Sequence, residues 1–135
     1  MTELADSLAG LPFYASYFGI ALLLLTLALA AYGAVTPYRD LRRAGEGNLA
    51  AAACLAGVVL GFALPLARVI AQSASLLDLL LWAGVALGVQ LVAFVALRTM
   101  ASTLNRNVAA GQLASGLLLA AVAVALGLIN AASIG

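Results

Sequence analysis

Four long runs of apolar residues, separated by short polar segments, organise the chain. We place them at about 13–35, 49–70, 76–97 and 108–130. Each run is long enough to cross a hydrocarbon core about 30 Å thick at a helical rise of 1.5 Å per residue. Backbone groups in lipid must be paired within the protein, and continuous apolar runs favour helices over alternating strands. The pattern therefore predicts four transmembrane helices.

A sequence repeat relates the two halves of the chain. The segment that begins at Asn48 (Asn-Leu-Ala-Ala) resembles the segment that begins 59 positions later at Asn107 (Asn-Val-Ala-Ala), and the tetrapeptides starting at Gly19 and Gly84 also correspond. An internal repeat defines the architectural unit. We therefore predict an all-α integral membrane protein built as two tandem helical hairpins. A short N-terminal segment covers residues 1–12, and the two repeats cover 13–75 and 76–135. In this alignment the first hairpin connection is longer than the second by about 6 residues.

The arginines predict the orientation of the hairpins. The first connection carries Arg39, Arg42 and Arg43, the third carries Arg98 and Arg106, and the middle one carries a single arginine. Positive residues favour the cytoplasmic side of a membrane. The first and third connections are therefore expected in the cytoplasm and both termini outside it, so that the two repeats enter the membrane in the same direction.

Composition supports a membrane protein and argues against several other classes. The chain is 66% hydrophobic and 8% charged, whereas soluble domains have about 25% charged residues. Its net charge of +1 gives no reason to expect a nucleic-acid partner. There is no histidine and one cysteine, and the sequence shows no paired groups for acid–base or nucleophilic chemistry. We predict no catalytic residues, no metal and no cofactor. Membrane lipid is the expected surrounding.

Small residues mark candidate helix contacts. Gly57 and Gly61 lie four residues apart in the second span, and Gly84 and Gly88 in the third. This spacing lets helix backbones approach closely in lipid, either within one protomer or between protomers of an oligomer. Pro65 interrupts the second span and is expected to kink it or to free a carbonyl group.

Four amide side chains are the candidate polar positions. Asn48 and Asn107 each precede an apolar run and are expected either to cap the following helix or to line a cytoplasmic mouth. Gln90 lies near the middle of the third span, where it would form an interhelical hydrogen bond or line a permeation path. Asn130, near the end of the fourth span, is expected to cap its helix or face an outer vestibule. Cys54 is expected to behave as a small hydrophobe without an activating neighbour.

A set of motifs extends over nearly the whole chain: Thr36-Pro37, Asn48-x-Ala50-Ala51, Gly57-x-x-Leu60-Gly61-x-x-x-Pro65-Leu66, Trp82-Ala83-Gly84-x-Ala86-Leu87-x-x-Gln90-Leu91, Asn107-x-Ala109-Ala110-Gly111 and Asn130-Ala131-Ala132. Together these motifs resemble the YjfL-type bacterial inner-membrane family, known as domain of unknown function 350. The resemblance implies a four-span protein made of two tandem copies of that domain in the bacterial inner (plasma) membrane. It also implies an association with envelope-stress systems.

Two functions follow as hypotheses. In the first, the protein is a non-enzymatic, homo-oligomeric structural or interaction subunit that docks a cytoplasmic protein through the connection containing Arg39, Arg42 and Arg43. In the second, several copies surround a channel or pore for ions or small solutes, with Gln90, Asn48, Asn107 or Asn130 facing it. A compact assembly with a dry interface would favour the first, and a continuous polar path would favour the second.

Overall fold

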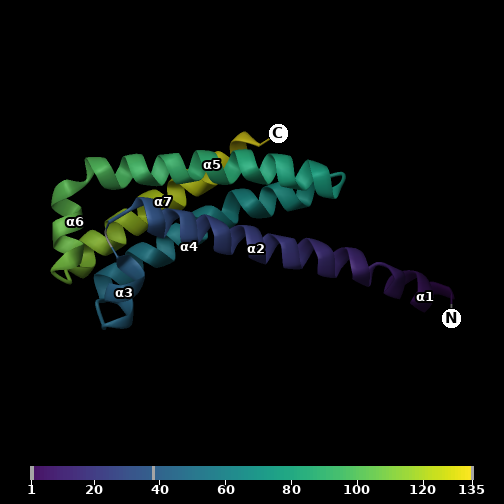
Figure 1. The fold of residues 1–135 in the computed structure, drawn as a ribbon, viewed down its shortest axis with the longest axis horizontal. Coiled ribbons are helices and arrows are strands. Elements are labelled where there is room, and N and C mark those ends of the chain that lie inside the picture. Colours follow the sequence, from purple (N-terminus) through teal and green to yellow (C-terminus); the bar gives the residue numbers. More distant parts are fainter. Residues whose placement is uncertain (1, 38, 135) are drawn as a thin grey trace.

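A computed structural model of the chain describes residues 2–37 and 39–134, and its described elements are all helices (Figure 1). Four of them are long and apolar enough to cross a membrane. The elements in chain order are α1 (Thr2–Ala9), α2 (Leu11–Val35), α3 (Asp40–Gly45), α4 (Leu49–Gln72), α5 (Leu76–Met100), α6 (Ser102–Ala109) and α7 (Leu113–Ser133). The predicted all-α membrane fold is confirmed. That the chain consists of two tandem copies remains a prediction.

The short helices α3 and α6 lie at one end of the molecule, which we call the α3/α6 end (Figure 1). The long helices α4 and α7 both start from this end, while α2 and α5 run toward it (Figure 1). Helix α2 diverges from the others along its N-terminal half and continues into α1, which points away from the bundle (Figure 1). Consistently, only Ala28 and Tyr32 of α2 are buried.

Helices α4 and α7 form the tightest pair because glycine removes side chains from their contact. A Cβ at Gly57 would lie 2.7 Å from the Cβ of Ala120, and a Cβ at Gly61 would lie 2.7 Å from the carbonyl oxygen of Ala123. Real side chains do not fit at such distances, so these glycines set how closely the two backbones approach. The Gly57/Gly61 motif is therefore used inside one protomer.

Pro65 fits the same contact. It lies buried inside α4, which continues through it to Gln72. Proline has no N–H, so the carbonyl of Gly61, four residues earlier, lacks its usual helical donor. A Cβ on Gly127 would be 2.5 Å from that carbonyl oxygen, which places the Gly127 Cα–H next to it. A weak Cα–H···O contact of this kind partly replaces the missing hydrogen bond.

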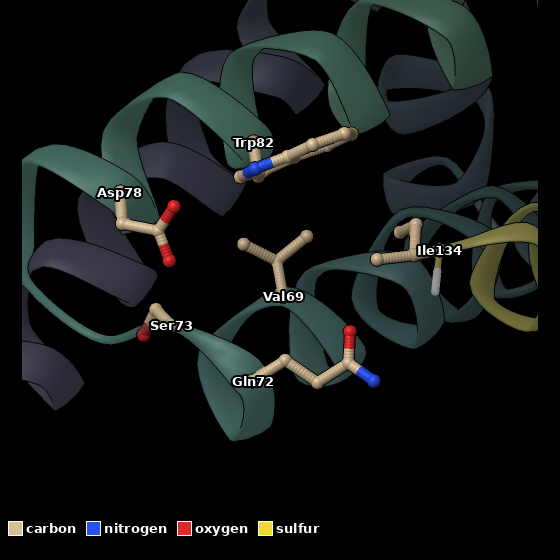
Figure 2. A pocket seen from close by; sticks show the side chains of 6 residues that line it. All are labelled: Val69, Gln72, Ser73, Asp78, Trp82 and Ile134. Carbon is tan, nitrogen blue, oxygen red and sulfur yellow. The ribbon is translucent and has the colours of Figure 1, made fainter.

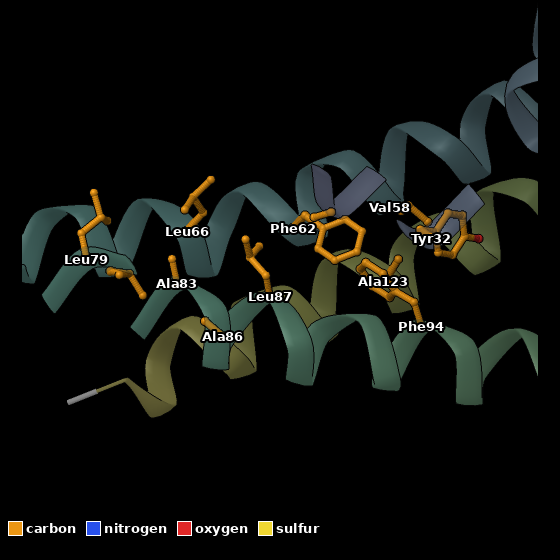
Figure 3. Packing of buried hydrophobic residues seen from close by; sticks show 12 residues of the cluster. Tyr32, Val58, Phe62, Leu66, Leu79, Ala83, Ala86, Leu87, Phe94 and Ala123 are labelled. Carbon is orange, nitrogen blue, oxygen red and sulfur yellow. The ribbon is translucent and has the colours of Figure 1, made fainter. Parts of the chain in front are cut away.

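The main apolar core lies between α4 and α5, with contributions from α2 and α7 (Figure 3). Phe94 packs edge-on against Phe62 and Tyr32, with ring centroids 4.9 and 6.1 Å apart. Such arrangements contribute about 0.5–1.5 kcal/mol beyond the burial of apolar area. These rings lie directly beside the polar cluster described below, because Tyr32 belongs to both.

The connections at the α3/α6 end correct the sequence alignment. Residue Gly47 (φ 93°) precedes α4 and Gly111 (φ 85°) precedes α7, in the left-handed region that favours glycine. The next residues, Asn48 and Gln112, occupy the two N-cap positions with nearly the same backbone angles. The connections 36–48 and 101–112 thus differ by one residue. The predicted six-residue difference was wrong, and so was the predicted start of the fourth span at 108, because α6 occupies that stretch.

A buried arginine cluster as the candidate functional site

Arg98 is the centre of a buried polar cluster at the α3/α6 end. It belongs to the last turn of α5, where a positive charge interacts favourably with the helix dipole. Its Nη1 donates to Asp40 Oδ2 at 2.6 Å and its Nη2 donates to Asp40 Oδ1 at 3.3 Å. Arg98 is 2% exposed and Asp40 is 5% exposed. Two unit charges are thus held together out of solvent by a two-point ion pair.

Three further helices contribute to this cluster. The hydroxyl of Tyr32 in α2 accepts from Arg98 Nη1 at 2.9 Å, and Cys54 Sγ in α4 lies 3.0 Å from the same nitrogen. In α6, Asn105 Oδ1 accepts from Arg98 Nε at 2.6 Å, while the Asn105 amide donates back to the Arg98 carbonyl. One guanidinium therefore holds together five helices, α2 through α6.

This arrangement supports a structural role, in which hydrogen bonds and an ion pair hold helices together. The guanidinium donates to Asp40, Tyr32 and Asn105, and the Asp40 carboxylate accepts from both Arg98 and Tyr32. Among the described residues, no group of three His, Cys, Asp or Glu side chains is placed to hold a metal ion. Because Asp40 is the first residue of α3, the cluster fixes this short helix against the membrane-spanning helices.

Sequence reasoning did not find this cluster. Arg98 directly follows an apolar run and Asp40 lies in the polar first connection, and neither position indicates a buried partner. The polar contact of Cys54 was not predicted either: Arg98 Nη1 donates to its sulfur. One signal was available: Asp40 and Asn105 lie 65 residues apart, the same separation as Gly19 and Gly84. Both oxygen-bearing side chains bind Arg98 from corresponding short helices.

Gln90 and Asn130, the candidate amides of the third and fourth spans, bind each other. Asn130 Nδ2 in α7 donates to Gln90 Oε1 in α5 at 3.0 Å and to the Ala86 carbonyl at 3.0 Å. Gln90 is 1% exposed, and its Nε2 has no hydrogen-bond partner among the described residues. The two residues thus form an interhelical contact inside one protomer, which was one of the two interpretations given for Gln90.

Asn48 and Asn107 occupy different environments. Asn48 caps α4 by accepting from the Ala51 N–H at 3.0 Å, and its amide donates to the Val108 carbonyl at 2.8 Å. It therefore both starts its helix and joins α4 to α6. Asn107 lies within α6, so the predicted cap of the fourth span was wrong. That N-cap position is held by Gln112, without a capping side-chain hydrogen bond.

The remaining candidate positions lie on the surface. A Cβ at Gly84 or Gly88 would meet no atom within 4 Å, so this motif faces away from the protomer. Arg39 precedes α3, while Arg42 lies on an exposed part of α3 and pairs with Glu46 at 3.3 Å. Arg43 lines a polar pocket of about 480 Å³ next to α6.

A second polar pocket lies at the opposite end, near the α4–α5 turn. Its volume is about 390 Å³, and its lining includes Asp78, Trp82 and Gln72 (Figure 2). The Asp78 carboxylate accepts from the Ala74 N–H at 3.0 Å, and Ser75 caps α5 through the Asp78 N–H at 3.1 Å. The acidic group in this pocket therefore stabilises the start of α5.

Comparison with known proteins places the chain in a family. The sequence profile described as Domain of Unknown Function (DUF350) matches residues 6–134. The chain belongs to the DUF350 family. The match is one continuous range, and the presence of two copies of the domain stays a prediction. No solved structure matches the chain.

The chain is also similar to two named membrane proteins. The UPF0719 inner membrane protein YjfL of Escherichia coli (strain K12) is 29% identical over 119 residues, covering 88% of this chain and 90% of the relative. The UPF0719 transmembrane protein YshE of Bacillus subtilis (strain 168) is 37% identical over 68 residues, covering 50% of this chain and 51% of the relative. With four apolar helices, this DUF350 member is a multi-pass integral membrane protein of an inner-membrane family.

Proposed function

We propose that the protein is a non-enzymatic interaction subunit of the inner membrane that works as a homo-oligomer. The observation that carries the proposal is the unpartnered Gly84/Gly88 face of α5. The first glycine pair packs against α7, whereas a Cβ at either residue of the second pair meets nothing within 4 Å. Glycine inside a helix costs about 1 kcal/mol relative to alanine. Two such residues four apart on a lipid-facing surface suit a contact with another helix.

The neighbouring side chains have the shape that such a contact needs. Leu81 and Val92 are 62% and 69% exposed, and they stand on either side of the two glycines along α5. The glycines thus form a shallow notch between larger apolar side chains. A second copy of α5 can place its own ridge in this notch, since helix association in lipid depends on close packing rather than on expulsion of water.

The pairing of the intramembrane amides favours this proposal over a pore. A pore lined by Gln90 or Asn130 requires them to face a path shared between protomers. Instead they bond to each other between α5 and α7 of one protomer. The link to envelope stress is supported by the family resemblance alone.

The test is the oligomeric state of the purified protein in lipid vesicles. A Cys54→Ala background with Val85→Cys places a thiol on the Gly84/Gly88 face, where Val85 is 57% exposed. Oxidative cross-linking at Val85 is expected, and a matched Leu27→Cys on α2, with 55% exposure, is expected to cross-link much less. Adding Gly84→Leu and Gly88→Leu should abolish the Val85 product. Equal cross-linking at both sites, or none at Val85, would contradict the proposal.

The pore alternative has its own measurement. Planar-bilayer conductance of the wild type and of Gln90→Leu should show no current in either protein. A conductance that the substitution changes would support a channel instead and overturn the interaction-subunit function.

A further inference from the structure

A long groove lies between α2 and α4 and ends at α3. Its volume is about 660 Å³. Apolar groups from the two long helices line most of it, including Leu29 and Gly33 of α2 and Leu55 and Val59 of α4. From Thr26 to Gly33 the groove follows α2 for about 10 Å. This is most of the depth of one hydrocarbon leaflet, which is about 15 Å.

The α3 end of this groove is cationic. Arg39 and Arg42 line the groove and also line a smaller pocket of about 210 Å³, together with Arg43 and Glu46. The two pockets share both arginines and so adjoin each other. An apolar channel of leaflet depth thus leads directly to a site rich in guanidinium groups. Among the described residues, Arg39 forms no ion pair with a carboxylate.

The arginine cluster fixes the position of these cations. Arg39 has a left-handed backbone (φ 52°, ψ 42°), a conformation that a residue with a Cβ adopts at an energetic cost and that recurs at ligand-binding positions. The next residue, Asp40, is held by Arg98. The buried ion pair thereby fixes the start of α3 and keeps Arg39 at the end of the groove.

We infer that this groove binds an anionic phospholipid. An acyl chain lies between α2 and α4, and the phosphate lies against Arg39 and Arg42. Basic pockets between transmembrane helices are a recurring site for anionic headgroups, and arginine matches phosphate through paired N–H donors. By the positive-inside prediction, the site belongs to the cytoplasmic leaflet.

Two carboxylates lie close enough to oppose a phosphate, and both already have partners. Asp40 lines the groove, but its charge is paired with Arg98. Glu46 pairs with Arg42 through one oxygen at 3.3 Å, and both side chains are more than 60% exposed. This exposed pair uses one Arg42 donor, so the other guanidinium N–H groups remain for the phosphate.

Native mass spectrometry of the full chain in detergent, titrated with phosphatidylglycerol, tests the inference. Phosphatidylglycerol should bind more tightly than phosphatidylcholine with the same acyl chains. Replacing both arginines, Arg39→Gln with Arg42→Gln, should weaken phosphatidylglycerol binding by about 25-fold, since each arginine is expected to contribute about fivefold. Gly33→Leu places a side chain into the groove at a position where a Cβ meets no atom within 4 Å. It should weaken phosphatidylglycerol binding by at least about fivefold, because the leucine displaces methylene groups of the acyl chain from the groove.

Matched controls separate the site from general effects on charge and folding. Arg106→Gln removes an arginine at the same end of the molecule but outside the groove, and Gly19→Leu makes the same change as Gly33→Leu elsewhere on α2, also in open space. Both should bind phosphatidylglycerol like the wild type, and all variants should keep the wild-type melting temperature within a few degrees.

Three results would overturn the lipid site. In the first, inorganic phosphate competes fully with phosphatidylglycerol and Gly33→Leu does not change phosphatidylglycerol binding. This result would show a phosphate site without a lipid. In the second, the double arginine variant keeps the wild-type affinity for phosphatidylglycerol. The two arginines would then be assigned to binding a protein partner instead of a lipid. In the third, Arg106→Gln loses as much phosphatidylglycerol binding as the groove arginine variant does. This result would show that the lipid is attracted by net charge alone.

Discussion

The guanidinium of Arg98 and the carboxylate of Asp40 are 58 residues apart in the chain and meet at 2.6 Å inside the bundle. Each belongs to a segment that hydrophobicity assigns to a loop. Their pairing draws α3 onto the end of the long helices and places Arg39 and Arg42 beside the groove between α2 and α4. One buried ion pair thus connects the packing of the bundle to the surface that we assign to lipid.

The ion pair predicts an asymmetric response to mutation. Asp40→Asn leaves the Arg98 charge buried without its counter-ion and should destabilise the protein by about 3–5 kcal/mol. Replacing both partners, Asp40→Leu with Arg98→Met, should recover most of this loss, because no charge then remains buried. Thermal unfolding in detergent measures both effects. Glu46→Gln breaks only the exposed pair with Arg42 and should change stability by less than about 1 kcal/mol.

Cys54 provides a native probe of the same cluster. It is the only cysteine in the chain, it is 1% exposed, and its sulfur contacts Arg98. A membrane-permeant maleimide should therefore label the folded wild type very slowly. Asp40→Asn should accelerate labelling at least tenfold, because opening of the cluster exposes the thiol. Rapid labelling of the wild type would contradict the buried position of Cys54.

The close approach of α4 and α7 predicts which glycines tolerate alanine. A Cβ on Gly127 would lie 2.5 Å from the backbone oxygen of Gly61, and a backbone atom cannot move aside as a flexible side chain can. Gly127→Ala should destabilise the protein by about 1–3 kcal/mol. Gly88→Ala, which adds a Cβ in open space, should leave the isolated protomer unchanged or slightly more stable. The free energy of unfolding of the two variants is compared in a detergent that keeps the protein monomeric.

The amide pair predicts a measurable coupling. Asn130→Leu removes the donor to Gln90 Oε1 and leaves a second polar atom of Gln90 without a partner. The double-mutant cycle with Gln90→Leu should give a coupling of about 0.6–1.7 kcal/mol, the range typical of hydrogen bonds between transmembrane helices. A coupling near zero would mean that the two side chains do not bind each other in the membrane.

The sequence predicted the membrane helices well because hydrophobicity alone determines them. The starts of α4 and α5 agree with the predicted starts at 49 and 76, and Asn48 was correctly expected to cap a helix. The fourth span was misplaced because the apolar letters after Asn107 continue from the end of α6 into α7. Only residues 110–112 separate the two helices, with the left-handed turn at Gly111, and glycine in an apolar run does not reveal that turn.

The arginine cluster was missed for a different reason. A charge at the end of an apolar run has the same appearance whether it faces water or a buried partner. Arg98 and Arg106 both read as loop arginines, yet Arg98 is buried and Arg106 is exposed. The distinction depends on α3, which carries Asp40 to Arg98 across 58 residues. No local pattern records that contact.

The predicted orientation determines the leaflet to which the lipid site belongs. If the α3/α6 end is cytoplasmic, a Cys54→Ala protein carrying Glu46→Cys should resist a membrane-impermeant maleimide in intact spheroplasts and react after permeabilisation. A matched Ser75→Cys, at the exposed α4–α5 turn, should react without permeabilisation. The expectation follows from the five arginines at the α3/α6 end against one, Arg68, at the opposite end of α4. The reverse pattern would place the groove between α2 and α4 in the outer leaflet and put both termini in the cytoplasm.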